Sequence, residues 1–561
     1  MPPFPRGALA VAAAISALAV AGPAEAIDMS LRPPFLPPVD GSGAAEALAH
    51  GGQGRDSIVA VEPGARAVAT LERSHARRLG DTIWLVDADH SAAVIRRLSA
   101  DGALRYAHGN DELRPSGLRS LLGDPLDPAP WWLPQIHANR VVAPSAGFPL
   151  TIVDDGIDTS HPEFAGRAIT FLNQNAVVAA DDFHGTMVSS VASAPANGVG
   201  MVGLYPLANL RSADVGTGRC ADVLAAFEAV VAAGPSIINM SWGFSPPSCL
   251  ALYEQILRAF AAGSLPVAAT GNLRLHWSPP GVPGMWPHVL TVGSTDAEGN
   301  VSEFSNEGLG IDLGAPGEEI VGATPTFFDP SGYSELEGTS FSSALVSAAA
   351  AWVQTRRPMH VTQLAELLRV TARDTGRPGW DKDTGFGILD LGAALSRRAP
   401  RADPQEPNDD VNQVKAGAIL KAVAPPLTHP GRGHASLRAR LDRSEDPVDV
   451  YRVFVPPRRM IRLHVTPTSN VDLEVFRPNA QTCYYENRRR ALAQGLIGGS
   501  YLHGRAAETF ALENRTHRGE YVFACVYKPR DRVTTASYKL SVATARQPIG
   551  ENGVLPRKGV S

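Results

Sequence analysis

The 561-residue sequence is poor in cysteine and in surplus charge, and each scarcity excludes a class of function. It has four cysteines and no Cys-x-x-Cys pair, which argues against a cysteine-based metal site. The formal net charge is −5, so neither nucleic acid nor an anionic membrane surface is indicated as a partner. The short run 488–490 of three arginines is typical of a solvated loop. Beyond the N-terminal region, no uncharged apolar run approaches the roughly 20 residues that span a bilayer, so no membrane span is expected.

The N-terminal region has the pattern of an export signal. Arg6 is the one early charge, an apolar run 8–21 follows, and Ala24-Glu25-Ala26 resembles a small-x-small cleavage site. We therefore predict a signal peptide over residues 1–26 and a secreted protein, either extracellular or periplasmic.

The cysteines fall into two regions of the chain. Because an even number in an exported protein indicates disulfides, three pairings are possible for Cys220, Cys249, Cys483 and Cys525. Separation along the sequence favours Cys220–Cys249 and Cys483–Cys525, and four reduced buried thiols are the alternative.

Composition shifts divide the chain into further segments. We predict a small α+β unit with a linker over residues 27–130, an α/β domain over 131–398, an antiparallel β-sandwich over 399–545 and a loose tail over 546–561. In the α/β domain, short apolar runs alternate with alanine-rich helical stretches, which indicates a parallel sheet with helices on both faces. The expected strands are 150–153, 209–213, 236–240, 266–270 and 289–292, and the expected helices are 185–194, 221–233, 250–262, 340–355 and 362–372.

The two flanking units have different patterns. In the first, we expect strands at 58–62, 82–86 and 104–107 and a helix at 92–98. In the third, apolar and polar residues alternate with period two, as in Ile461-Arg-Leu-His-Val465, and no helical stretch intervenes. This alternation predicts the sandwich.

Three short segments of the α/β domain contain the residue types of nucleophilic catalysis. Asp154 and Asp155 end an apolar strand, His184 opens a helix of small residues, and Ser340 opens a long apolar helix. Each has an ordinary structural interpretation when taken alone: an Asx turn, a structural histidine and a serine N-cap. The serine hydroxyl would, however, stand where unpaired backbone N–H groups favour developing negative charge.

Taken together, the three segments resemble the signature blocks of the subtilisin-like serine peptidases, the subtilases of family S8. The blocks here are Asp154-Asp-Gly156, His184-Gly-Thr-Met-Val188 and Gly338-Thr-Ser-Phe-Ser342, in the family's order and with spacings of 30 and 156 residues between the three key residues. Further similar blocks are 237–243, 266–272, 281–287, 315–317 and 385–390, so the resemblance covers about residues 131–395.

The resemblance implies a secreted endopeptidase that cuts protein or peptide chains through an acyl-enzyme. Ser340 would be the nucleophile, His184 the general base and acid, and Asp154 the acid that orients the imidazole. Asn272 would supply the oxyanion hole together with the Ser340 N–H. Four residues would bind the substrate: Ser241, Trp242, Gly243 and Gly281.

The flanking units fit this resemblance. Residues 58–114 are similar to the family's pro-peptide, which acts as an intramolecular chaperone and inhibitor, so the chain would be made as a zymogen. The region from Pro404 is similar to a pre-peptidase C-terminal β-sandwich, and a plain stability cap is an equal interpretation. The reaction requires no cofactor. Glu163 and Asn197 occupy positions like two calcium ligands of the family, which leaves a structural calcium ion as an option.

This sequence departs from the family pattern at several positions. Asp155 stands where Thr or Ser is usual, and a second carboxylate there would raise the pKa of the histidine and move the activity optimum upward. Trp242 is bulkier than the residue that the family commonly has at this position, and it would narrow the substrate-binding cleft.

Two other functions remain to be weighed. A catalytically silent binding protein on the same fold is disfavoured by the intact Asp154, His184, Ser340 and Asn272. A lipase or esterase would need a Gly-x-Ser-x-Gly elbow and the order Ser, acid, His, and this sequence has neither around Ser340.

Overall fold

The structure is a computed structural model that describes residues 57–109 and 130–545, with short internal gaps. The gaps are residues 62–64, 79–82, 102, 178–182, 244–248, 250, 274–279, 309, 327–328, 404, 416–418, 421, 443–445, 481, 484–491, 494 and 530–534. The predicted signal peptide 1–26, the tail 546–561 and the arginine run 488–490 therefore lie outside the described residues. None of the helices within the described ranges combines the length and hydropathy of a membrane span.

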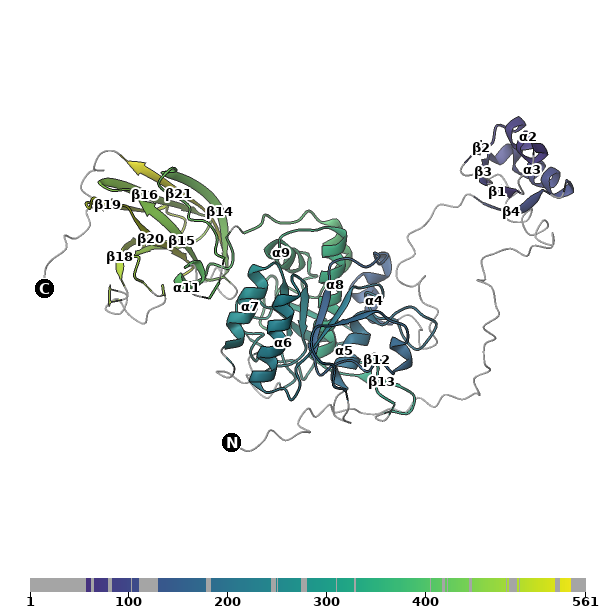
Figure 1. The fold of residues 1–561 in the computed structure, drawn as a ribbon, viewed down its shortest axis with the longest axis horizontal. Helices are drawn as coiled ribbons and strands as arrows, with labels where there is room; N and C mark the ends of the chain where they lie inside the picture. The colour runs from purple at the N-terminus through teal and green to yellow at the C-terminus, as the bar shows by residue number, and fades with distance from the viewer. Residues whose placement is uncertain are drawn as a thin grey trace. The chain divides into compact units, whose positions relative to one another are not determined.

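The N-terminal unit is an α+β fold with a core of its own (Figure 1). Its four-stranded sheet has the order β2-β3-β1-β4 and comprises β1 (Ser57–Val61), β2 (Arg77–Arg78), β3 (Ile83–Val86) and β4 (Leu104–Gly109). Helix α3 (Ala88–Ala100) buries Val94, Ile95 and Leu98, which recur on one face of the helix. Helix α2 (Ala65–Arg73) was not predicted from the sequence. The described residues between 57 and 109 belong to a compact unit distinct from the one that contains the described residues from 130 onwards.

The α/β domain contains a seven-stranded parallel sheet of order β11-β10-β9-β8-β5-β7-β6. Its strands are β5 (Leu150–Asp154), β6 (Ile169–Phe171), β7 (Leu210–Asp214), β8 (Ile237–Met240), β9 (Leu265–Ala269), β10 (Leu290–Thr295) and β11 (Leu313–Pro316). The five predicted strands are all present. Two edge strands were missed: β6, which is short and partly exposed, and β11, whose Gly and Pro are atypical of a strand.

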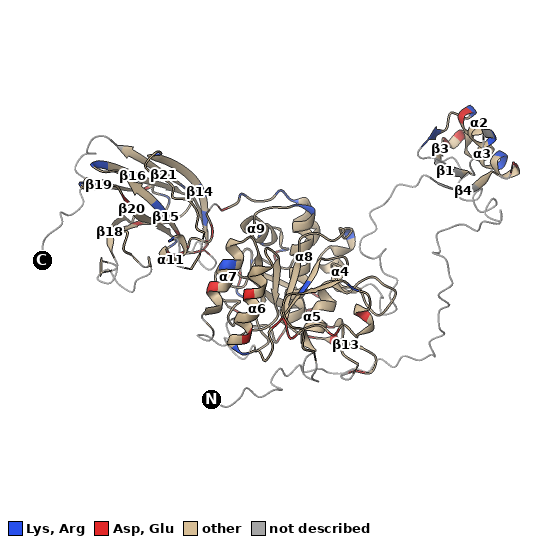
Figure 2. Cartoon of the chain, in the orientation of Figure 1, with Lys and Arg blue, Asp and Glu red and all other residues tan. Residues whose placement is uncertain are grey.

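Both faces of this sheet are covered, as the sequence pattern predicted. Along β8 and β9, Ile237 and Val267 belong to one hydrophobic core, whereas their neighbours Ile238 and Ala268 belong to another. Because successive side chains of a strand point to opposite faces, each face packs on its own set of helices. The helices are α5 (His184–Ser193), α6 (Cys220–Ala232), α7 (Ala251–Ala261), α8 (Thr339–Arg356) and α9 (Val361–Thr371). Strands β8, β9 and β10 contain no charged residue, and most of the domain's ribbon is tan in Figure 2. The charges on β5 and β7 are Asp154, Arg211 and Asp214.

Helix α8 is the central helix of the domain. Every residue from Thr339 to Gln354 is buried, so the helix has no exposed stripe and packs on all sides. The run 348–351 of four alanines lets neighbouring elements approach it closely. Shorter elements complete the domain: α4 (Trp132–Gln135), η2 (Ala138–Arg140), η3 (Pro162–Phe164), α10 (Leu391–Ser396) and the hairpin of β12 (Ile320–Ala323) and β13 (Tyr333–Leu336).

The C-terminal region is the predicted antiparallel β-sandwich. One sheet has the order β14-β21-β16-β19 and the other β15-β20-β17-β18. The strands are β14 (His434–Asp442), β15 (Val448–Val455), β16 (Arg459–Pro467), β17 (Asp472–Phe476), β18 (Leu496–Ser500), β19 (Glu508–Asn514), β20 (Glu520–Tyr527) and β21 (Thr535–Ala545). On β16, Ile461, Leu463 and Val465 enter the core between the sheets, as their alternation indicated.

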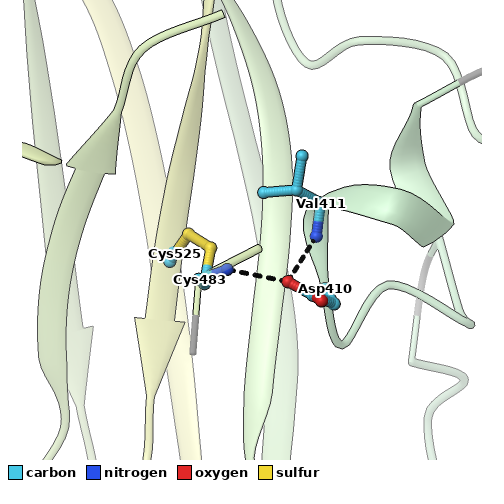
Figure 3. Close-up of a disulfide and its surroundings, with 4 residues drawn as sticks. All are labelled: Asp410, Val411, Cys483 and Cys525. Carbon is cyan, nitrogen blue, oxygen red and sulfur yellow. Dashed lines mark hydrogen bonds between the residues drawn. A yellow bond between two sulfur atoms is a disulfide. The ribbon is translucent and has the colours of Figure 1, made fainter. Parts of the chain in front are cut away.

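Both predicted disulfides are present. Cys220 at the start of α6 bonds to Cys249 before α7, and Cys483 bonds to Cys525 of β20. Figure 3 shows the second disulfide beside Asp410, whose Oδ1 accepts the N–H groups of Cys483 (2.7 Å) and Val411 (2.8 Å). Asp410 is thus the N-cap of the short helix α11 (Val411–Val414) and ties it to the cysteine segment.

We expect the double substitution Cys220→Ser and Cys249→Ser to destabilise the α/β domain. The bond closes a loop of 29 residues, and in the chain-entropy model such a loop contributes about 3–4 kcal/mol. Differential scanning calorimetry should therefore show a Tm several degrees lower than that of the parent. A Tm equal to that of the parent would mean that the bond does not constrain the unfolded chain.

Candidate active site

The candidate site lies where three neighbouring strands of the parallel sheet end. Asp154 is the last residue of β5, Ser241 follows β8, and Asn272 comes three residues after β9. The strand order reverses at β5. After β5 the chain forms β6 and β7 on one side of this strand, and it then crosses over to form β8 to β11 on the other side. Ligands of open α/β sheets bind at the carboxyl ends of strands where the order reverses.

Asp154, His184 and Ser340 form a continuous chain of polar contacts. The Nδ1 atom of His184 lies 2.8 Å from Oδ1 of Asp154, and its Nε2 atom lies 3.1 Å from Oγ of Ser340. Asp154 is buried, whereas the His184 side chain remains 18% exposed. Three segments whose key residues are 30 and 156 positions apart in the sequence therefore converge at one place.

Asp155 fixes the helix that begins with His184. Its carboxylate accepts the backbone N–H of His184 (3.1 Å) and of Gly185 (2.5 Å), two donors that a helix N-terminus leaves without intrahelical partners. The negative charge also suits the positive end of the helix dipole. A Cβ atom at Gly185 would lie 2.2 Å from the carbonyl oxygen of Gly156, so this close approach requires glycine.

The electrostatics of the site favour a protonated histidine. Burial lowers the pKa of His184, but the charge and hydrogen bond of Asp154 and the charge of Asp155 outweigh it and raise the pKa to about 9. Burial and the charge of Asp154 raise the pKa of Asp155 to about 7, against the opposing effects of His184 and the two N–H groups. The direction predicted for the effect of Asp155 on the histidine is therefore confirmed.

The Ser340 hydroxyl has two acceptors within reach. Its Oγ lies 3.1 Å from Nε2 of His184 and 3.0 Å from the carbonyl oxygen of Ser241. Because a hydroxyl has a single proton, it can donate to His184 only when the imidazole is neutral. When the imidazole is protonated, Nε2–H donates to Oγ and the hydroxyl donates to Ser241.

The side chain of Ser241 points away from the substrate side. Its hydroxyl donates to the carbonyl oxygen of Ser340 (2.8 Å) and lies 3.0 Å from the Ser343 hydroxyl. The two serines thus hold β8 and the start of α8 together by reciprocal hydrogen bonds. From the sequence, Ser241 was expected to bind the substrate, and its hydrogen bonds to the start of α8 were not predicted.

Two donors converge beside Ser340 where an oxyanion would form. Ser340 is the second residue of α8, so its N–H has no intrahelical acceptor. Oδ1 of Asn272 accepts the N–H (3.0 Å) and the hydroxyl (2.7 Å) of Thr339, and this anchor directs the amide. The Nδ2 group of Asn272 has no acceptor among the described residues. A Cβ at Gly338 would lie 3.1 Å from this Nδ2, so glycine keeps the donor accessible.

Thr339 was quoted in the sequence block but given no role. Besides anchoring Asn272, its hydroxyl oxygen accepts the N–H of Gly271 at 3.1 Å. Its position in the Gly-Thr-Ser block, directly before the nucleophile candidate, is the signal that could have identified it.

The residues assigned to substrate binding lie at the same sheet edge. Gly243 faces the segment of Gly281, since a Cβ at Gly243 would lie 3.9 Å from Cα of Gly281 and 3.2 Å from the carbonyl oxygen of Val282. The Nε1 of Trp242 donates to the carbonyl oxygen of Val153 in β5 (2.6 Å), and the ring packs on the core of the α6–α7 face. The indole is therefore directed into the domain, and its effect on the width of the substrate cleft stays a prediction.

Glu163 and Asn197, the two candidate calcium ligands, lie next to each other. Nδ2 of Asn197 donates to the main-chain oxygen of Glu163 (3.2 Å), and its Oδ1 accepts the N–H of Val199 (2.9 Å). Oε2 of Glu163 accepts the N–H of Met201 (3.0 Å) and the Tyr333 hydroxyl (2.9 Å). These oxygens already serve protein donors, and calcium needs six to eight, so calcium at this loop stays a prediction.

Comparison with known proteins agrees with this geometry. The family model described as "Subtilase family" matches residues 145–387. Subtilisin DY from Bacillus licheniformis is 30% identical over 277 residues, which are 47% of this chain and 98% of that protein. Subtilisin BL from Lederbergia lenta is also 30% identical, with the same two coverages.

Solved structures give a weaker match. Sphericase is 25% identical and aligns with 47% of this chain and 98% of its own, at a TM-score of 0.40. The sequence relatives carry the assignment, because the chain covers nearly their whole length. The protein belongs to the subtilase family and is a subtilisin-like serine endopeptidase.

Proposed function

We propose that this chain is a secreted endopeptidase that hydrolyses peptide bonds of protein substrates with Ser340 as nucleophile. The single observation that carries the proposal is the contact chain of 2.8 Å and 3.1 Å from Asp154 through His184 to Ser340. A serine hydroxyl is a weak nucleophile unless a base takes its proton, and His184 is the base in contact with it.

The reaction would proceed in two acyl-transfer steps. His184 accepts the Ser340 proton as Oγ attacks the substrate carbonyl, and later returns it to the leaving amine. Asp154 holds the tautomer with Nδ1–H and stabilises the imidazolium. The oxyanion accepts hydrogen bonds from the Ser340 N–H and the Asn272 amide, and water then hydrolyses the acyl-enzyme with His184 as base.

The substrate would bind as an extended strand. Residues 241–243 continue β8 beyond the sheet, and their backbone groups can pair with a peptide as in β-augmentation. Gly243 packs directly against the segment of Gly281, so the peptide would lie beside these two segments and not between them. The N-terminal unit has its own core and sheet, which supports a role as a pro-peptide that assists folding and inhibits the enzyme.

Ser340→Ala should abolish covalent labelling by a fluorophosphonate and lower kcat by about 10⁶, the loss seen when subtilisin loses its nucleophile. Labelling is read by intact mass spectrometry. Ser342→Ala is the matched control, since this neighbouring hydroxyl donates to the carbonyl oxygen of Pro316 instead. If the parent chain takes up no label and cuts no protein substrate, the silent binding protein becomes the better assignment.

Asp155→Thr should move the acid limb of the kcat/KM–pH profile to lower pH. Only neutral His184 accepts the serine proton, so activity rises as pH increases through its pKa, which Asp155 helps to raise towards 9. Removing this charge lowers the pKa, and threonine still offers an oxygen to the helix N-terminus. Asp158→Ser is the control. The Asp158 charge does not contribute to the raised pKa of His184, so the acid limb of the profile should stay where it is in the parent. An unmoved limb in Asp155→Thr would contradict the electrostatic coupling.

Asn272→Ala should lower kcat by about 10²–10³ with little change in KM, the loss that follows removal of one such donor from subtilisin. The donor acts on charge that develops only in the transition state. Thr339→Val keeps the Asn272 amide but removes the Thr339 hydroxyl that anchors it. The kcat of this variant should therefore lie between that of the parent and that of Asn272→Ala. Steady-state kinetics with a chromogenic peptide tests both, and a loss expressed only in KM would argue against an oxyanion donor.

A further inference from the structure

The β-sandwich is basic although the chain as a whole is acidic. Residues 434–545 contain 18 Lys and Arg against 11 Asp and Glu, whereas the formal net charge of the complete sequence is −5. Three of those acids, Asp449, Glu474 and Glu508, are buried. The positive charge is therefore concentrated at the surface of the sandwich, and a local excess of one sign is typical of surfaces that bind the opposite sign.

Part of this charge is gathered on the outer face of one sheet. In the sheet β14-β21-β16-β19, Leu463 and Val465 of β16 and Leu540 of β21 point into the core. Because successive side chains of a strand alternate, the residues between them point outward. We call the outward side chains of three adjacent rows across this sheet the basic face. They are His434, Ser436 and Arg438 of β14, Lys539, Ser541 and Ala543 of β21, Arg462, His464 and Thr466 of β16, and Thr509 and Ala511 of β19.

Two cations stand directly opposite each other on the basic face. Arg438 of β14 pairs with Lys539 of β21 in the ladder, and both side chains are exposed. Residues directly opposite in an antiparallel pair have Cβ atoms about 4.5–5.5 Å apart, and like charges at this spacing are destabilising. An anion bound across the pair would remove the repulsion. Arg440, the next outward residue of β14, instead pairs with Glu366 of α9 and is not counted in the face.

No carboxylate of the basic face neutralises these cations. Its three rows contain no Asp or Glu. Within the ranges that the structure describes, Arg438, Lys539 and Arg462 form no ion pair. The outward acids of the four strands are Asp442 and Glu513, which lie at strand ends beyond the three rows. The cations are therefore available to an anion from outside the chain.

Hydroxyl groups lie between the cations. Ser436 is opposite Ser541, and Ser541 is opposite His464. Nδ1 of His464 lies 2.9 Å from the Thr509 hydroxyl oxygen, and its Nε2 lies 3.4 Å from the Thr466 hydroxyl oxygen. The face thus combines cations with short side chains that both donate and accept hydrogen bonds. This combination suits a ligand that carries anionic groups and hydroxyl groups together.

The shape and composition of the basic face favour a linear polysaccharide over other polyanions. Its rows extend about 14 Å along the strands, at about 3.4 Å per residue. They contain no Phe, Tyr or Trp, on which the bases of single-stranded nucleic acids stack. They also contain no large aliphatic side chain that could enter a membrane interface. The small residues Ser541, Ala543 and Ala511 between the cations leave room for sugar rings.

We propose that the basic face binds a linear acidic polysaccharide through the carboxylate or sulfate groups that its sugars carry. Arg438, Lys539 and Arg462 contact the anionic groups, and the Ser and Thr hydroxyls bond to hydroxyls of the sugars. Such binding concentrates the enzyme on a matrix of this chemistry. It does not depend on the proposed catalytic residues.

The test measures binding to heparin and to polygalacturonate, two such polysaccharides, by isothermal titration calorimetry at low salt. The full chain carries Ser340→Ala, which prevents self-digestion. The triple variant Arg438→Gln, Lys539→Gln and Arg462→Gln should bind both about 100-fold more weakly, since each Lys or Arg near an anionic surface contributes about fivefold. The slope of log K against log salt should become shallower by about one for each cation removed.

Three comparisons separate the face from the charge of the domain as a whole. A control with Arg477→Gln, Arg505→Gln and Arg518→Gln removes the same charge from exposed positions outside the face, and its dissociation constants should stay near those of the parent. Dextran, a neutral polysaccharide, should not bind. Arg438→Gln should unfold no earlier than the parent, because it removes one of two opposing like charges.

Three results would overturn the proposal. The first is a parent chain that binds neither polysaccharide at low salt. The second is an equal loss of binding in both triple variants, which would indicate attraction to net charge alone. The third is tighter binding of duplex DNA, or of vesicles that contain phosphatidylserine, than of either polysaccharide. If the basic-face variant lost that binding, the face would belong to nucleic acid or to a membrane.

Discussion

The close approach of helix α5 to the end of strand β5 is the constraint on which the site depends. It allows Asp154 to reach Nδ1 of His184 while Asp155 receives the N–H groups of the same helix start. Two adjacent carboxylates thereby act in different ways, one on the imidazole and one on the backbone. The absence of a side chain at Gly185 makes this approach sterically possible.

The third member of the site is supplied by a helix buried in the middle of the domain. Helix α8 packs on all sides, so Ser340 at its start has little freedom to move relative to the strand ends. The reciprocal hydrogen bonds with Ser241 and the Thr339–Asn272 anchor attach this start to β8 and to the segment after β9. The residues proposed as nucleophile, base and oxyanion donor are thus held on rigid elements, as preorganised catalysis requires.

Much of this architecture was predictable from the sequence, for identifiable reasons. Buried parallel strands such as 237–240 are continuous apolar runs, and the triad residues stand in blocks typical of the family. Strand β6 was missed because it lies at an edge and is partly exposed. The gathering of Asp403, Glu406 and Asp449 was not predicted, because the segment of the first two has the composition of a polar boundary and Asp449 meets it only through tertiary folding. Likewise, nothing in the local sequence of Ser241 indicates that its hydroxyl lies beneath α8.

The two acceptors of the Ser340 hydroxyl have a consequence for the enzyme at rest. When the imidazole is protonated, the Ser340 hydroxyl donates to the Ser241 carbonyl oxygen and cannot give its proton to His184. This change requires no movement of the backbone. When Nε2 of His184 loses its proton, rotation of the Ser340 hydroxyl about one bond restores its hydrogen bond to the imidazole. Protonation of one imidazole would thus switch the proposed nucleophile off, and loss of that proton would switch it on, with no other change than the acceptor to which one hydroxyl donates.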